Sequence, residues 1–478
     1  MDLSKNRNLI IFFSVVFLSN FFFKLIYIGT PSLWYDEIIS ANDTQLDFGH
    51  IKHEAEWDKN PPFYHYVLWV WSKMFGITEI ALRSMSAFFN SLTAILIFII
   101  SRKISTQLYA IAATVIFSFH PYLFYYAQEA RCYSLLIFLI TSNLILVHSL
   151  VKKPSLLKTF FLGVLNFLIF YTHYISGLIL FCQFIYLALI FRRKIMYLAL
   201  IYITPILLVL IRFTRKQYDV LFFSTEMSKQ KSNVPLSSMD TLVQAIPPLY
   251  ISVFVLVIFL LVLVYFLFQK IKMEHLLLNQ EFQFKMFILF TPLLCILILF
   301  GLGKVTNVFH ERYLIFTIPY IIISFFVFAE NKIILSALAT IIVVFEIANI
   351  EFGKSKGMDY KFCAVLTKEI QKKGEVNILV QTHDVISLFV YYHDRELYES
   401  KKWRDRDVLS RKNIYYIDNV DDLINTRFDE SKPVLFFQTY QRKDDDIKIT
   451  ELFKSRNYQT FTTNQITGVK FTYLQRVK

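Results

Sequence analysis

About eleven apolar stretches divide this chain, each close to the roughly 20 residues that a helix needs to cross a bilayer. Of the 478 residues, 55% are hydrophobic, which is more than a soluble chain of this size usually carries. The sequence therefore predicts an all-α, polytopic membrane region. The predicted spans lie near residues 8–28, 80–101, 106–121, 133–151, 156–172, 174–191, 195–212, 248–268, 284–302, 313–329 and 332–350.

Many basic residues of the chain lie at the boundaries of these spans. Its formal net charge of +13 could indicate nucleic acid, but short basic clusters at every second boundary are typical of cytoplasmic loops. The pattern predicts a multi-pass protein of the plasma (inner) membrane, with no nucleic-acid partner. Its N-terminus would be cytoplasmic, and residues 351–478 would lie outside. The clusters are Lys5/Arg7, Arg102/Lys103, Lys152/Lys153, Arg192–Lys194, Lys270/Lys272 and Lys332.

Residues 351–478 differ in character from the membrane region, residues 1–350. Short apolar runs alternate with charged segments, which predicts a small extracytoplasmic α/β domain. It has no Gly-rich phosphate loop, and Asp444–Asp446 is interpreted as a solvated loop. The predicted strands are 376–381, 413–418 and 434–440, and the predicted helices are 384–393 and 420–425.

Two adjacent carboxylates, Asp36 and Glu37, follow the first apolar run. They open an outer loop, residues 29–79, whose aromatic part near 63–75 is interpreted as an interfacial helix. Carboxylates beside hydrocarbon are costly to desolvate, so such a pair suggests chemistry, ion binding or a water-filled cavity. A helix cap or a solvated loop charge explains it equally well.

Further charged clusters are predicted on the same side of the membrane. Glu129 and Arg131 lie at the outer end of a hairpin, either as a structural ion pair or as an acid with a phosphate-binding cation. Arg312 and Lys304 suit phosphate, or they anchor helix ends at the headgroups. Arg83 lies just inside a span, where a cation needs an anionic partner.

Histidines give a weaker signal in this sequence. His65, His173 and Asn60 could bind a divalent cation together with Asp36 and Glu129, but no spacing requires it. We therefore predict no metal site and no certain cofactor, and a divalent cation remains open. The four cysteines show neither metal-binding nor disulfide spacing.

Five motifs in one order resemble the bacterial branch of the protein O-mannosyltransferase and aminoarabinose-transferase superfamily, whose fold is the integral-membrane GT-C fold. The resemblance covers residues 8–190, and Asn60 departs from the His that many relatives carry before Pro-Pro. The motifs are Trp34-Tyr35-Asp36-Glu37, Asn60-Pro61-Pro62-Phe63-Tyr64, Ala81-Leu82-Arg83-Ser84, Tyr126-Ala127-Gln128-Glu129-Ala130-Arg131-Cys132-Tyr133 and Tyr171-Thr172-His173-Tyr174.

The resemblance implies a glycosyltransferase that takes its sugar from a polyprenyl-phosphate carrier. The family's catalytic Asp matches Asp36, its neighbour matches Glu37, and the acid after the third span matches Glu129. The expected acceptor is a hydroxyl of a cell-envelope glycan, a lipopolysaccharide, another glycolipid or a protein. Candidates for binding the phosphate or substrate are Arg83, Arg131, Arg312, His65, Lys304 and Tyr133.

Two other classes of protein remain open on sequence grounds. A transporter or flippase for lipid-linked sugars also places charged groups near the membrane surface, although it is expected to show mid-span charges or internal repeats. A non-catalytic assembly scaffold would tolerate substitutions of Asp36 and Glu129. Neither the sugar nor the oligomeric state follows from the sequence.

Overall fold

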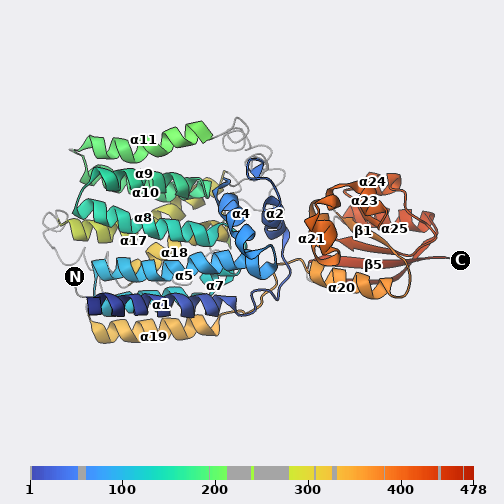
Figure 1. Cartoon of the computed structure of the whole chain (residues 1–478), viewed down its shortest axis with the longest axis horizontal. Helices are drawn as coiled ribbons and strands as arrows, with labels where there is room; N and C mark the ends of the chain where they lie inside the picture. Colours follow the sequence, from blue (N-terminus) through green and yellow to red (C-terminus); the bar gives the residue numbers. More distant parts are fainter. Residues whose placement is uncertain are drawn as a thin grey trace. The chain divides into compact units, whose positions relative to one another are not determined.

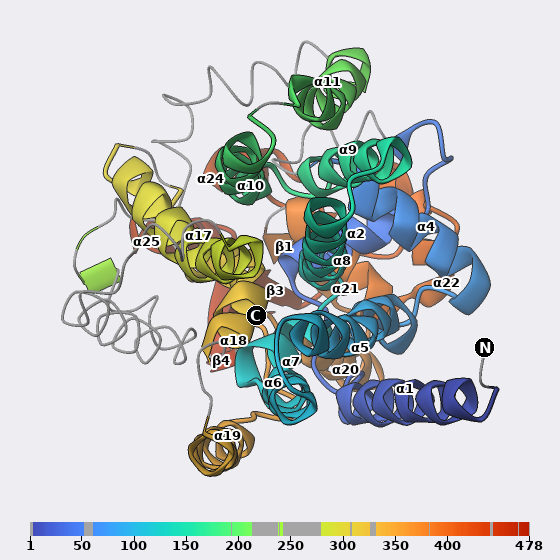
Figure 2. The ribbon, with the colours of Figure 1, turned by 90° about the vertical axis from the view of Figure 1, so that its left-hand side faces the viewer.

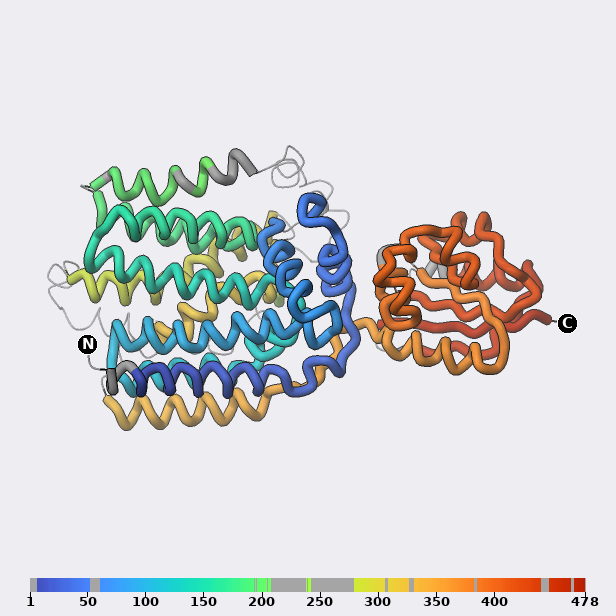
Figure 3. Tube along the Cα trace, in the orientation of Figure 1, coloured from blue at the N-terminus to red at the C-terminus, as the bar shows by residue number. Residues whose placement is uncertain are grey.

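The computed structural model of the chain contains two compact units, which are described separately (Figures 1 and 3). The first comprises Met1–Ile26, Phe48–Val70 and Arg83–Glu351, and the second comprises Tyr27–Asp47, Trp71–Leu82 and Phe352–Lys478. The structure describes residues 3–51, 61–192, 194–212, 238, 240–241, 279–305, 308–325, 331–381, 383–439, 443–466 and 468–477.

The first unit is a bundle of apolar helices, seen end-on in Figure 2. Helices occupy every predicted span except 248–268, which lies outside the described residues. The elements are α1 (Leu3–Leu25), α4 (Phe63–Phe75), α5 (Glu79–Ile104), α6 (Gln107–Phe119), α7 (Pro121–Ala127), α8 (Tyr133–Lys152), α9 (Leu156–Phe170), η1 (Tyr174–Ser176), α10 (Gly177–Ile190), α11 (Ile195–Arg212), α17 (Gln280–Gly303), η3 (Glu311–Thr317), α18 (Ile318–Phe325) and α19 (Lys332–Ala348).

Some of these helices can span a membrane, judged by their length and composition. Among the described residues, four helices are long and apolar enough to cross a membrane, or up to five if the bent pair α6–α7 forms one span. The four are α1, α5, α8 and α17. Shorter apolar helices, including α9 and α10, accompany them. A multi-pass membrane protein is therefore confirmed, and eleven spans stay a prediction.

Buried amides join three consecutive helices of the bundle. Asn143 on α8 donates from Nδ2 to Asn166 Oδ1 on α9 at 2.7 Å. Gln183 on α10 donates from Nε2 to the Oδ1 atom of the same Asn143 at 3.0 Å. All three side chains are almost fully buried. Polar side chains that satisfy one another between helices stabilise packing in a bilayer, where an unsatisfied amide is costly.

The second unit contains a five-stranded sheet in the order β2-β1-β3-β5-β4. β1 (Asn377–Gln381) pairs in parallel with β2 (Ile414–Tyr416) and β3 (Val434–Gln438). β5 (Val469–Arg476) pairs antiparallel with both β3 and β4 (Tyr458–Ile466). The other elements are α2 (Tyr35–Asp43), α20 (Tyr360–Gln371), α21 (His383–His393), α22 (Arg395–Glu399), η4 (Lys402–Arg404), α23 (Arg406–Ser410), α24 (Val420–Asn425) and α25 (Lys443–Ser455).

The three predicted strands and two predicted helices of the C-terminal region are present as β1, β2, β3, α21 and α24. The β4–β5 hairpin was not predicted, because β4 is rich in polar residues and residues 459–465 are exposed. The interpretation of Asp444–Asp446 as a loop is wrong. These residues belong to the first turns of α25.

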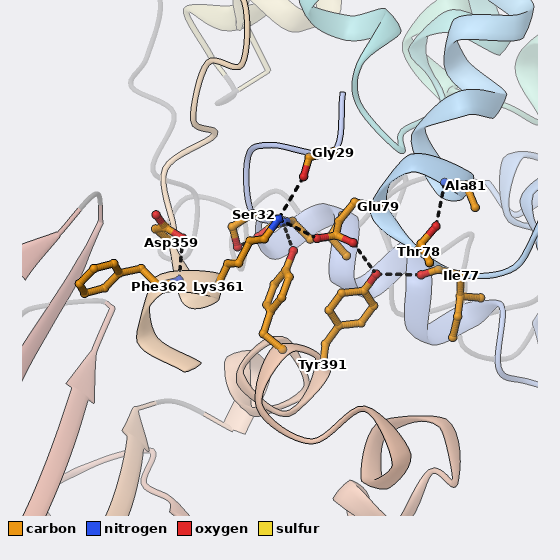
Figure 4. A network of polar contacts seen from close by, with 12 residues as sticks. Gly29, Ser32, Ile77, Thr78, Glu79, Ala81, Asp359, Lys361, Phe362 and Tyr391 are labelled. Atoms are coloured by element: carbon orange, nitrogen blue, oxygen red, sulfur yellow. Dashed lines mark hydrogen bonds and ion pairs between the residues drawn. The ribbon is translucent and has the colours of Figure 1, made fainter. Parts of the chain in front are cut away.

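Two early segments of the chain pack with this C-terminal domain, within the second unit. Lys361 on α20 donates to Gly29 O at 3.1 Å and pairs with Glu79 at 3.5 Å (Figure 4). Tyr391 on α21 donates to Ile77 O at 2.8 Å. The second unit therefore includes both ends of the outer loop that the sequence predicts at residues 29–79.

Candidate active site

The linker between α7 and α8 carries the second acidic motif. The bend after α7 is closed by the amide of Arg131, which donates to Glu129 O at 2.8 Å. Ser86 on α5 donates from Oγ to Glu129 O at 2.5 Å, and also lies 3.4 Å from Arg131 O. The side chains of Glu129 and Arg131 are buried. α5 therefore fixes the backbone from which both charged groups project.

The same linker is tied to the end of the first helix. Gln128 donates from Nε2 to Lys24 O at 2.9 Å and to Ile26 O at 2.7 Å. These carbonyls belong to the end of α1, where intrahelical partners are lacking. Gln128 thus satisfies backbone acceptors at the point where the chain leaves α1.

Two guanidinium groups lie near the first residue of α8, and a carboxylate lies near α7. Arg312 at the start of η3 and Arg131 in the linker both interact electrostatically with Tyr133. Glu129 interacts in the same way with Tyr122 and Tyr126 of α7. η3 packs against α8. The arrangement places two guanidinium groups and one carboxylate near the N-terminus of α8, which favours anions.

Aromatic side chains form one wall of this site. The ring centroids of Tyr126 and Tyr133 lie 4.7 Å apart, and those of Tyr133 and His173 lie 6.2 Å apart. Tyr313 continues the series, 5.5 Å from His173, and its ring carries the Arg312 guanidinium at 5.3 Å. Aromatic faces of this kind bind sugar rings and cations.

His310 caps η3 and holds Arg312 in place. Its Nδ1 accepts the backbone N–H of Arg312 at 3.2 Å, so the imidazole must be neutral at this atom. Burial, together with the smaller effect of the nearby positive charge of Arg312, lowers the pKa of His310 to about 4. Because folding depresses this pKa, the stability of the folded state is full above the ordinary value of about 6.5. It decreases as the pH falls from 6.5 toward 4, since the unfolded state then binds a proton that the folded state does not.

A His310→Asn variant should remove this pH dependence. Asn presents an oxygen at the position of Nδ1 and does not titrate, so the cap is retained. We expect the thermal unfolding midpoint of the wild type to fall between pH 6.5 and pH 5 by more than that of the variant. Parallel slopes for the two proteins would show that the charge on His310 is not responsible.

Of the candidates predicted from sequence, Glu129, Arg131, Tyr133 and Arg312 come together. Arg83 is fully buried on α5, three residues before Ser86 and hence on a similar face of the helix. Lys304 is exposed at the end of α17, with its ammonium 5.3 Å from the Phe300 ring, which fits an interface anchor better than a site cation. His65 is buried on α4, and Asn60 lies outside the described residues.

Asp36 and Glu37 lie in the first turn of α2, in the second unit. Of the two structural alternatives for this pair, the helix cap describes Glu37, and the solvated loop charge does not. Its side chain is fully buried, and Oε2 accepts the Trp34 N–H at 3.4 Å, as in half of a capping box. Ser40 donates to Asp36 O at 3.1 Å. The convergence of Asp36 with Glu129 stays a prediction.

Several residues of the site were not predicted from sequence. Ser86 and Gln128 act through hydrogen bonds to backbone carbonyls, which no spacing rule reveals. Tyr313 stands beside a predicted Arg, and Tyr126 belongs to a quoted motif, but their stacking depends on tertiary packing. Within the described part of the chain, no three His, Cys, Asp or Glu side chains are grouped so as to hold a metal ion.

Comparison with known proteins gives a partial family match and a match across the fold. Residues 59–215 match the family model described as dolichyl-phosphate-mannose-protein mannosyltransferase. A search of curated protein sequences found no match. The crystal structure of ArnT from Cupriavidus metallidurans bound to undecaprenyl phosphate superposes with a TM-score of 0.56, at 12% identity over 98% of each chain.

Two further solved structures are similar. The apo state of the same ArnT also gives a TM-score of 0.56, at 11% identity over 98% of each chain. The oligosaccharyltransferase of Archaeoglobus fulgidus covers 79% of this chain and 61% of its own, at 11% identity and a TM-score of 0.40. Residues 59–215 thus match the mannosyltransferase family model, and the chain as a whole shares the fold of ArnT.

Proposed function

We propose that this protein transfers a sugar from a polyprenyl-phosphate carrier to a hydroxyl of a cell-envelope acceptor on the outer face of the membrane. The observation that carries the proposal is the group formed by the buried Glu129 and Arg131 and the half-buried Arg312 beside Tyr133, in a chain with the ArnT-like fold. The relative of known structure binds undecaprenyl phosphate, and a lipid phosphate is the anion that these cations suit.

The chemistry is a single displacement at the anomeric carbon. The acceptor oxygen forms the new bond to this carbon while the bond to the phosphate oxygen breaks. The hydroxyl proton passes to Asp36, which acts as the general base. Glu37 supports Asp36 by capping the turn that carries it, and Glu129 orients the sugar or the acceptor.

The leaving phosphate gains negative charge as the sugar departs. Arg131 and Arg312 are proposed to stabilise this charge together with the N-terminus of α8, since fixed cations in a desolvated site are effective at such a position. Their forked guanidinium groups match phosphate oxygens better than an ammonium does. Arg83 is a third candidate cation.

Reconstituted liposomes test the proposal against the transporter alternative. The purified protein is supplied with a radiolabelled polyprenyl-phosphate sugar and a mixture of envelope acceptors. Covalent label on the acceptor supports transfer. Label that moves between leaflets while remaining on the carrier would contradict the proposal and favour a flippase.

An Arg312→Gln variant should lose about 10²- to 10³-fold in kcat/KM, because one stabilising group at the leaving phosphate is removed. Arg312→Lys should recover only part of the loss, since it keeps the charge but not the fork. Arg102→Gln, at the exposed end of α5 where Arg102 donates to Ser105 O at 3.2 Å, serves as the matched control. Equal effects of the two Gln variants would argue against a phosphate role for Arg312.

A further inference from the structure

The helix that carries Asp36 is held by side chains from the far end of the sequence. α2 packs against α21, within the second unit. The amide of Asn42 has partners on both sides: Nδ2 donates to Ser387 Oγ at 3.1 Å, and Oδ1 accepts from the Tyr398 hydroxyl at 3.0 Å. One residue of α2 is therefore fixed by both α21 and α22.

Both ends of the α2 segment are held in the same way. Before the helix, the Leu33 N–H donates to the Tyr392 hydroxyl at 2.7 Å. After it, Gln45 donates from Nε2 to Tyr398 O at 3.2 Å. Leu33, Gln45, Tyr398 and Ser387 are all buried, so water cannot readily replace these bonds. The C-terminal domain thus contacts the segment before, within and after α2.

These contacts approach α2 from a side other than that of Asp36. Asn42 follows Asp36 by six residues, so at 3.6 residues per turn their side chains project about 120° apart around the helix axis. The two positions are about 9 Å apart along the axis. The contacts at Asn42 thus fix the backbone of α2, and with it the direction in which the Asp36 side chain leaves the helix.

We propose that the C-terminal α/β domain positions the general base, with Asn42, Ser387, Tyr392 and Tyr398 as positioning residues. This rests on the proposed role of Asp36. A tilt of about 6° in α2 moves a group about 9 Å away by about 1 Å, and an error of that size in a reacting group costs about a hundredfold in rate. The domain thus acts on the rate of the reaction, although none of the four positioning residues is required to touch substrate.

The test uses the full-length protein in nanodiscs and the double variant Tyr398→Phe/Ser387→Ala. We expect kcat to fall by about 10- to 100-fold while the KM for the lipid-linked donor stays within about twofold. Adding Asn42→Leu to this variant should cause little further loss, because all three changes remove the same two bonds.

The matched control is Tyr458→Phe in the same domain. The Tyr458 hydroxyl donates to Glu430 O and Lys432 O, each at 3.0 Å, and these partners lie away from the α2 segment. This variant should keep kcat within about twofold of the wild type. A comparable loss of kcat in the control, or an unchanged kcat in the double variant, would overturn the proposal.

Hydrogen exchange gives a readout that does not depend on catalysis. In the double variant, amides of residues 35–46 should exchange at least about tenfold faster than in the wild type, and those in the control should not. Unchanged exchange would overturn the positioning role even if transfer is observed. If the wild type transfers no sugar, the proposed function fails, while the exchange data still decide whether the domain holds α2.

Discussion

An Asp36→Asn variant should transfer sugar at least about a thousandfold more slowly than the wild type. General-base catalysis typically contributes 10²- to 10⁴-fold, and an amide cannot accept the proton of the acceptor hydroxyl. Asn has nearly the same shape as Asp and keeps the helix N-terminus polar. Folding and donor binding should therefore be retained, and the loss should appear in kcat.

Asp47→Asn is the matched control for this experiment. Asp47 lies four residues after the end of α2 and is exposed, so the substitution removes one acid from the same segment without affecting the proposed base. Transfer rates of both variants are measured in liposomes, and donor binding is measured separately. Full activity of Asp36→Asn would remove Asp36 from the catalytic role, and equal losses in both variants would indicate a general electrostatic effect.

The second large effect concerns stability. Lys24 is fully buried near the end of α1, where its ammonium donates to Ser118 O and lies 5.3 Å from the Phe124 ring. It attracts Glu346 on α19, whose side chain is only 4% exposed. Lys24→Met leaves the Ser118 carbonyl and the Glu346 carboxyl buried without the ammonium group, and a buried polar group that loses its partner costs about 1–3 kcal/mol, so the variant should lower the free energy of unfolding.

A double variant tests whether the coupling between Lys24 and Glu346 contributes to this loss. Lys24→Met/Glu346→Leu replaces both charged groups with apolar side chains, a change that is often neutral or stabilising. We expect it to recover most of the stability lost in Lys24→Met, measured by thermal unfolding in one detergent. If the double variant is as unstable as Lys24→Met, the loss of stability in Lys24→Met does not come from Glu346.

The positions of most helices could be predicted from the lengths of the apolar runs alone. Helices such as α5 and α8 lie within a few residues of the predicted spans, because a run of about 20 apolar residues has few alternatives in a bilayer. The breaks between helices were harder to predict. The bend at His120-Pro121 separates α6 from α7 by 58°, and it depends on the proline and on a cap from His120.

Only the charged residues of the candidate site could be predicted from the sequence. Glu129, Arg131 and Arg312 stand out because such side chains are rare beside apolar runs. Ser86 does not stand out, since a serine hydroxyl that anchors a backbone carbonyl resembles any other small polar residue in a helix. α2 was missed because its nine residues, YDEIISAND, carry too little apolar periodicity for a surface helix.

The three buried amides of Asn143, Asn166 and Gln183 bear on biosynthesis. They belong to α8, α9 and α10, which emerge from the ribosome one after another, long before α17. Once α10 has been made, each amide has its partner among these three helices, so they can adopt a fixed rotational alignment during insertion. The remainder of the bundle would then assemble against a preformed template.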